Sequence, residues 1–103
     1  MTHRLTQLLE LLQEMPDDAF LKYGVALEYQ SIKEDDTALQ HFLELKLKHS
    51  DYLPLYYQLG KLYERIDQNE NAIKAYNDGI MIARIAKDQH TLNELQNALD
   101  ELW

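Results

Sequence analysis

Two segments of the chain recur later in it, and this internal repetition constrains the fold more than any other feature. Residues 20–27, FLKYGVAL, share an aromatic residue, a Gly and an apolar spacing with residues 56–63, YYQLGKLY, at a displacement of 36. Residues 38–45 begin with Ala and carry an aromatic residue four positions on, as do residues 72–79, at a displacement of 34. Repetition at such a period is typical of stacked helical units. We ascribe the difference of two between the displacements to a longer turn in the first copy.

The spacing inside each segment predicts a helix. Four residues of the first segment share one helical face because they are spaced i, i+3, i+4 and i+7: Phe20, Tyr23, Gly24 and Leu27. A Gly inside a helix costs about 1 kcal/mol relative to Ala, so we expect a neighbouring helix to approach closely at Gly24 and at Gly60. The Ala that opens each later segment allows the same approach. Each copy is therefore predicted to be a hairpin of two packed helices.

Two amphipathic helices are predicted outside the hairpins, one near each end. Residues 2–15 place several Leu side chains on one face, and residues 88–103 do the same with Leu92, Leu95 and Leu99. We therefore predict a single all-α domain, residues 1–103, with about six helices. Its parts are an N-terminal half-repeat helix at 2–15, repeat 1 at 17–52, repeat 2 at 53–86 and a C-terminal capping helix at 88–103.

Capping residues predict where the helices begin. Asp and Thr accept hydrogen bonds from the first free N–H groups of a helix, and Pro fits its first turn. The polar residues 33–36 and 67–69 are expected to form the two hairpin turns, with residues 49–51 linking the repeats. The expected start signals are Asp17 or Asp18, Asp36 or Thr37, Pro54, and Thr91 with Glu94 as a capping box.

Charge and composition exclude several classes of function. Ten Lys and Arg against eighteen Asp and Glu give a net charge of −8, which repels phosphate backbones, so we expect no nucleic-acid partner. No stretch approaches the roughly 18 apolar residues of a membrane span, and we expect no membrane partner. The start lacks the unbroken apolar core of a signal peptide and the chain has no Cys, so the expected location is cytoplasmic.

No constellation of residues predicts catalysis or a bound cofactor. The four His residues form no zinc-binding spacing, and the acidic residues form no calcium loop. Ser31 and Ser50 lack the context of a nucleophile, and the three Gly residues are isolated. We expect no cofactor and no enzymatic activity, and metal-dependent hydrolysis is the weakest hypothesis.

The Gly, Ala and aromatic spacings of residues 17 to about 84 resemble the tetratricopeptide repeat (TPR) family. Ser50 stands where the family usually has a closing Pro, which Pro16 supplies one repeat earlier. The resemblance implies a TPR-like α-solenoid of antiparallel helix hairpins, wound into a right-handed superhelix. Its concave face, lined by the first helix of each hairpin, is implied to accept an extended peptide or a partner helix.

The resemblance also indicates which residues face the partner. Projecting the helical stripes places four residues of the first repeat and three of the second on the concave groove: Leu21, Val25, Glu28, Ile32, Tyr57, Lys61 and Glu64. The predicted function is that of an adaptor or scaffold that binds another protein.

Self-assembly through the end helices is the alternative function. The wide Leu face of residues 5–12, together with Leu99, Leu102 and Trp103, could join copies of the chain into a homo-oligomer. The same residues could instead only cap the stack. We favour capping, and with it a monomer over a homodimer.

Overall fold

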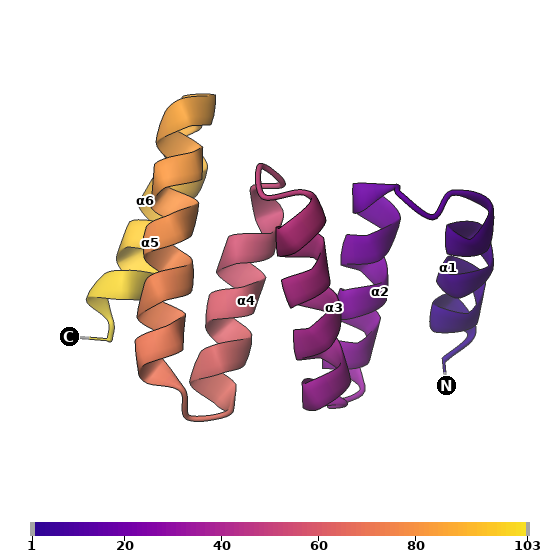
Figure 1. Ribbon diagram of the computed structural model, residues 1–103. Coiled ribbons are helices and arrows are strands. Elements are labelled where there is room, and N and C mark those ends of the chain that lie inside the picture. The colour runs from indigo at the N-terminus through magenta and orange to yellow at the C-terminus, as the bar shows by residue number, and fades with distance from the viewer. Residues whose placement is uncertain (1, 103) are drawn as a thin grey trace. The chain divides into compact units, whose positions relative to one another are not determined.

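The computed structural model describes residues 2–102 and contains six helices joined by short turns (Figure 1). No strand occurs within this range, so the predicted all-α fold is confirmed. In chain order the helices are α1 (His3–Glu14), α2 (Ala19–Ser31), α3 (Asp35–Lys48), α4 (Pro54–Arg65), α5 (Asn69–Ala86) and α6 (Gln89–Asp100). The chain groups into two compact units, Met1–Tyr52 and Leu53–Trp103.

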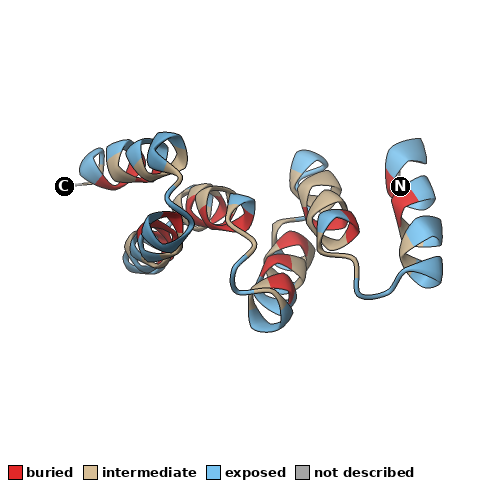
Figure 2. Cartoon of the chain, turned by 90° about the horizontal axis from the view of Figure 1, so that it is seen from above, coloured by how far each residue is buried: buried red, intermediate tan, exposed pale blue. Residues whose placement is uncertain are grey.

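The first unit consists of the α2–α3 hairpin with α1 packed on α2. The hairpin closes over Ala38, Phe42 and Leu45 of α3, all fully buried, and the Tyr23 ring meets Phe42 edge-on at 6.4 Å between centroids. Leu5 and Leu8 of α1 form a second cluster with side chains of α2. Because α1 carries its apolar residues on one side, its other side remains exposed (Figure 2).

The second unit consists of the α4–α5 hairpin with α6 packed on α5. Small residues allow both contacts: a Cβ added to Gly60 of α4 would lie 2.2 Å from Cε1 of Tyr76, and one added to Gly79 of α5 would lie 2.6 Å from Cβ of Tyr56. The same Cβ on Gly79 would lie 2.9 Å from Leu95 of α6. The predicted close approach of a neighbouring helix at Gly60 is therefore confirmed.

The turn of the second hairpin repeats the turn of the first at an offset of 34 residues: Asp67 is the counterpart of Lys33, and Gln68 is the counterpart of Glu34. Each turn has one residue at φ 62°, Lys33 in the first and Asp67 in the second. Each turn also has the same closing hydrogen bond, from the N–H of Glu34 to the carbonyl of Tyr29 (2.9 Å) and, in the second copy, from that of Gln68 to Tyr63 (2.8 Å). The two turns are therefore of equal length, and the longer first turn predicted from sequence is wrong.

The match at a displacement of 36 between the first helices is wrong for the same reason. At a displacement of 34, the residue equivalent to Gly60 is Ala26, which is fully buried, and not Gly24. Gly24 instead faces α1, where an added Cβ would lie 3.3 Å from a methyl carbon of Leu8. Phe20, which the predicted stripe places on the same face as Gly24, is 68% exposed. Helix α2 has small and apolar residues on two faces, because α3 covers one face and α1 covers the other.

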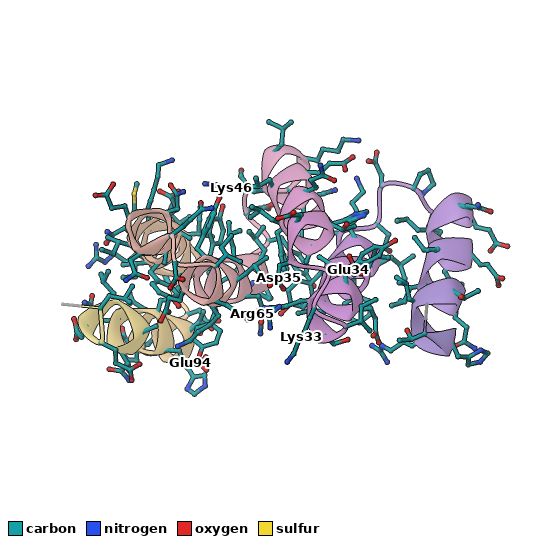
Figure 3. All side chains as sticks on the ribbon, turned by 90° about the horizontal axis from the view of Figure 1, so that it is seen from below. Lys33, Glu34, Asp35, Lys46, Arg65 and Glu94 are labelled. Carbon is teal, nitrogen blue, oxygen red and sulfur yellow. The ribbon has the colours of Figure 1, made fainter. Side chains whose placement is uncertain are left out.

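The helix starts agree in part with the capping predictions. Asp18 caps α2, accepting from the N–H of Leu21 at 2.9 Å, and Pro54 occupies the first turn of α4, as predicted. Asp36 and Thr37 were the wrong residues for α3, which begins at Asp35 after Glu34 (Figure 3). Thr91 does not cap α6: Asp88 does, accepting from the N–H of Thr91 at 3.0 Å and from its hydroxyl at 2.9 Å. These hydrogen bonds lower the pKa of Asp88.

His41 of α3 makes stability depend on pH. Its ring stacks on Tyr29 of α2 with 5.1 Å between centroids, and burial lowers its pKa below the ordinary 6.5, although the nearby Glu44 carboxylate opposes the shift. As pH falls, His41 becomes protonated in the unfolded chain before it does in the folded chain. The contribution of His41 to the free energy of unfolding is therefore highest above pH 6.5 and falls as pH decreases through 6.5 toward the lower folded pKa. Urea unfolding at about pH 7.5 and about pH 5.5 should show this loss. His41→Phe should reduce it, and an unchanged loss in that variant would exclude His41 as its source.

Candidate protein-binding surface

The structure does not place two of the four groove residues predicted on the first repeat on an open surface. Leu21 and Val25 are 6% and 0% exposed and pack against Leu5 and Leu8 of α1. Their prediction as partner-contacting residues is therefore wrong for this structure.

The other two residues predicted on the first repeat are more accessible but belong to local contacts. The Glu28 carboxylate pairs with the guanidinium of Arg4 at 2.8 Å, which ties α2 to α1. Ile32 is the C-cap of α2 and is 37% exposed. Glu28 is thus engaged within the first unit, and Ile32 lies at the end of its helix.

The error follows from the two-residue shift in register. At a displacement of 34, the counterparts of the four residues on α4 are Leu55, Leu59, Leu62 and Ile66. The first three of these are buried in the core of the second unit. A shift of two residues turns a helix by about 200°, which moves a prediction from one face to nearly the opposite one.

The three residues predicted on α4 do lie together. The Lys61 ammonium is 5.5 Å from the centroid of the Tyr57 ring and 3.7 Å from the Glu64 carboxylate. The Tyr76 hydroxyl of α5 donates a hydrogen bond to the same carboxylate. All three side chains are half-buried, so they are accessible but held in place. We call Tyr57, Lys61 and Glu64 the α4 cluster.

The neighbouring Tyr76 fixes one side of the α4 cluster. Its ring centroid is 6.4 Å from that of Tyr57. Burial and the hydrogen bond to Glu64 raise the pKa of Tyr76 far above its ordinary value, so the hydroxyl stays protonated and remains a donor. The Glu64 carboxylate is thereby oriented by Tyr76 and Lys61 together, and little side-chain freedom is left to be lost when a partner binds.

Sequence reasoning missed the counterparts of this cluster on α2. At the same offset, which takes Ala38 to Ala72, they are Tyr23, Leu27 and Gln30, all half-buried. The Tyr23 ring lies 5.4 Å from that of Tyr52, between centroids, in addition to its contact with Phe42. The displacement between the two Ala-aromatic segments was the signal that could have located them. The α2 surface is thus more apolar than the charged α4 cluster.

The described part of the chain shows no features of a metal centre or a membrane segment. Within residues 2–102, no group of three or more His, Asp and Glu side chains is arranged to hold a metal ion. Over the same range, no helix has the length and apolar character needed to cross a bilayer.

Solved structures show which known proteins the chain is similar to, whereas no family model and no curated protein matches it. A tetratricopeptide repeat domain protein from Salinibacter ruber, determined by NMR in solution, is 41% identical, with a TM-score of 0.81 over 84% of this chain and 88% of that one. A protein from Bordetella parapertussis has a TM-score of 0.85 at 24% identity, covering 99% of this chain and 89% of that one. MamA has a TM-score of 0.70 at 17% identity, covering 95% and 64%. The last two show the fold alone.

The helix pairing, the constant repeat period and the small residues between paired helices define a protein built of repeated helical hairpins. The 41% identity across most of both chains then specifies the kind of repeat. The chain belongs to the tetratricopeptide repeat family.

Proposed function

We propose that this chain is an adaptor that binds a segment of another protein through the α4 cluster, without catalysing a reaction. The similar structures support a protein-interaction repeat module in general. The observation that carries the more specific proposal is the α4 cluster, in which an aromatic ring, an ammonium group and a carboxylate lie within one helical face.

The chemistry of the cluster indicates what kind of segment it would bind. Tyr57 offers an aromatic surface, and Lys61 and Glu64 offer charges of both signs. The counterpart surface on α2, with Tyr23 and Leu27, would take apolar side chains. A partner segment that carries a charged residue beside an apolar or aromatic residue fits the α4 cluster best.

Truncating the α4 cluster tests the proposal. We expect Tyr57→Ala combined with Lys61→Ala to reduce capture of the partner from an extract of the source cells by about tenfold or more, because a few central aromatic and charged residues carry most of the energy of an interface. Capture is measured by quantitative mass spectrometry of proteins retained on the immobilised chain.

A matched variant keeps this test specific. Lys74→Ala combined with Met81→Ala also removes one charge and one large side chain, from exposed positions on α5, and should leave capture unchanged. Circular dichroism should show the same helicity for all three proteins. Equal capture by the wild type and the Tyr57 and Lys61 variant would contradict the proposal.

At the C-terminal end, α6 bears on the self-assembly hypothesis. The side of α6 that corresponds to the buried face of α4 carries Gln89, Asn93 and Glu94, all exposed. Polar residues on a terminal helix are typical of a capping role. Trp103, one of the residues on which the self-assembly hypothesis was based, lies outside the described residues. We therefore retain the adaptor as the proposed function.

A further inference from the structure

The repeat period extends backward to α1 and shows what kind of helix it is. Arg4, Leu8 and Leu11 stand one period before Ala38, Phe42 and Leu45 of α3, and two periods before Ala72, Tyr76 and Gly79 of α5. The six residues of α3 and α5 are all buried. The α3 residues are covered by α2, where the Tyr23 ring contacts Phe42. The α5 residues are covered by α4, where Gly60 lies against Tyr76. α1 is therefore a second helix of a hairpin by position.

The corresponding side of α1 is open. Leu11 is 44% exposed and Met15 is 48% exposed, whereas Leu8 is almost buried because its methyl groups reach Gly24 of α2. A shallow cavity of about 460 Å³ lies along this side. Its lining comes from α1 alone: Arg4, Gln7, Leu8, Glu10, Leu11 and Glu14. We call this surface the α1 face.

We propose that the α1 face binds a basic amphipathic helix of a partner protein. The internal repeat supplies the argument for a helix, because each equivalent face in the chain is covered by one. Leu8 and Leu11 are the apolar residues of the lining and lie one helical turn apart, and Leu11 is the one left open to an apolar side chain of a partner helix. This binding is separate from that of the α4 cluster, and neither depends on the other.

The acidic residues of the α1 face determine that the partner helix should be basic. The exposed residues Glu10 and Glu14 lie one turn apart on the same side of Leu11. Arg4 does not neutralise them, because its guanidinium is paired with Glu28 at 2.8 Å and is held against α2. The chain carries a net charge of −8, so a second copy on this face would bring two acidic surfaces together, whereas a helix with Lys or Arg beside its apolar residues would be attracted.

Two designed helical peptides test the proposal. They share an identical Leu stripe, and one has Lys and the other Glu on both flanks of the stripe. Fluorescence anisotropy of the labelled peptides should show saturable binding of the Lys peptide to the wild-type chain and none of the Glu peptide. Leu11→Glu should weaken binding of the Lys peptide by about tenfold or more.

A matched control separates docking from simple charge attraction. Leu47→Glu introduces the same change on α3 at a residue that is 83% exposed, and it should bind the Lys peptide as the wild type does. Non-specific attraction would instead strengthen binding in both variants, because both add a negative charge. The variant with Tyr57→Ala and Lys61→Ala should also bind the Lys peptide normally, so this proposal and the adaptor function fail independently.

Several outcomes would overturn the proposal. Wild-type binding by Leu11→Glu, or absence of binding by the wild type, would remove the α1 face as a helix-docking site. A wild-type dimer in sedimentation equilibrium that Leu11→Glu converts to monomers would show that a second copy is the occupant. If Leu11→Glu fails to fold, Glu14→Lys, which changes an exposed residue of the same lining, should weaken binding of the Lys peptide.

Discussion

Val25→Glu is expected to lower the free energy of unfolding by roughly 3–5 kcal/mol, because it buries an unpaired carboxylate. Val25 is 0% exposed and contacts α1 through the cluster that includes Leu5 and Leu8. A domain of this size is stabilised by about 5–15 kcal/mol in total, so much of the structure's stability would be lost. Urea denaturation followed by circular dichroism measures the change.

The matched substitution is Phe20→Glu on the same helix. Phe20 is 68% exposed, so this change should alter the free energy of unfolding by no more than about 0.5 kcal/mol. The register inferred from the FLKYGVAL segment predicts the reverse order, with Phe20 in the core and Val25 on the surface. A larger loss for Phe20→Glu than for Val25→Glu would therefore refute the register that pairs Ala26 with Gly60.

Gly60→Ala should destabilise the protein by about 1–3 kcal/mol, even though Ala is the better helix former. The new Cβ would lie 2.2 Å from Cε1 of Tyr76, and the Tyr76 ring is fully buried and has no room to move. This steric cost exceeds the gain of about 1 kcal/mol expected from helix propensity. The loss should appear as a lower urea midpoint with an unchanged slope.

Gly24→Ala is the internal comparison for Gly60→Ala. Its added Cβ would lie 3.3 Å from a methyl carbon at the flexible end of Leu8, which needs to move by only a few tenths of an ångström. We expect the free energy of unfolding to stay the same or to rise by up to about 1 kcal/mol. Equal destabilisation by the two substitutions would show that the two glycines have the same structural role, contrary to the structure.

Much of the fold could be predicted from sequence because its signals are local. The helix at residues 2–15 was observed as His3–Glu14, and the final helix predicted within 88–103 was observed as Gln89–Asp100. Apolar spacing and the turn residues determine such elements within a few neighbouring positions. The helix start near Asp36 was missed by little, because three acidic residues in a row, Glu34 to Asp36, give no unique cap.

The candidate surface was only half predictable because it depends on contacts between helices. On α4, Tyr57, Lys61 and Glu64 were placed on one accessible face, since the Tyr56 and Gly60 stripe beside them is the true core stripe. On α2, two stripes contain apolar and small residues, and sequence alone does not show that α1 covers the one with Leu21 and Val25. Gly24 was matched to Gly60 by residue type, whereas the equal turn lengths match Ala26 to Gly60.

Proton–proton contacts in a NOESY spectrum test directly the register of the two hairpins, in which Ala26 is the counterpart of Gly60. The structure predicts strong cross-peaks from the Gly60 α-protons to the Tyr76 ring and from the Gly24 α-protons to the Leu8 methyl groups. Cross-peaks from Gly24 to the ring of Phe42, with none to Leu8, would instead support the match of Gly24 to Gly60 and contradict the surfaces assigned on α1 and α2.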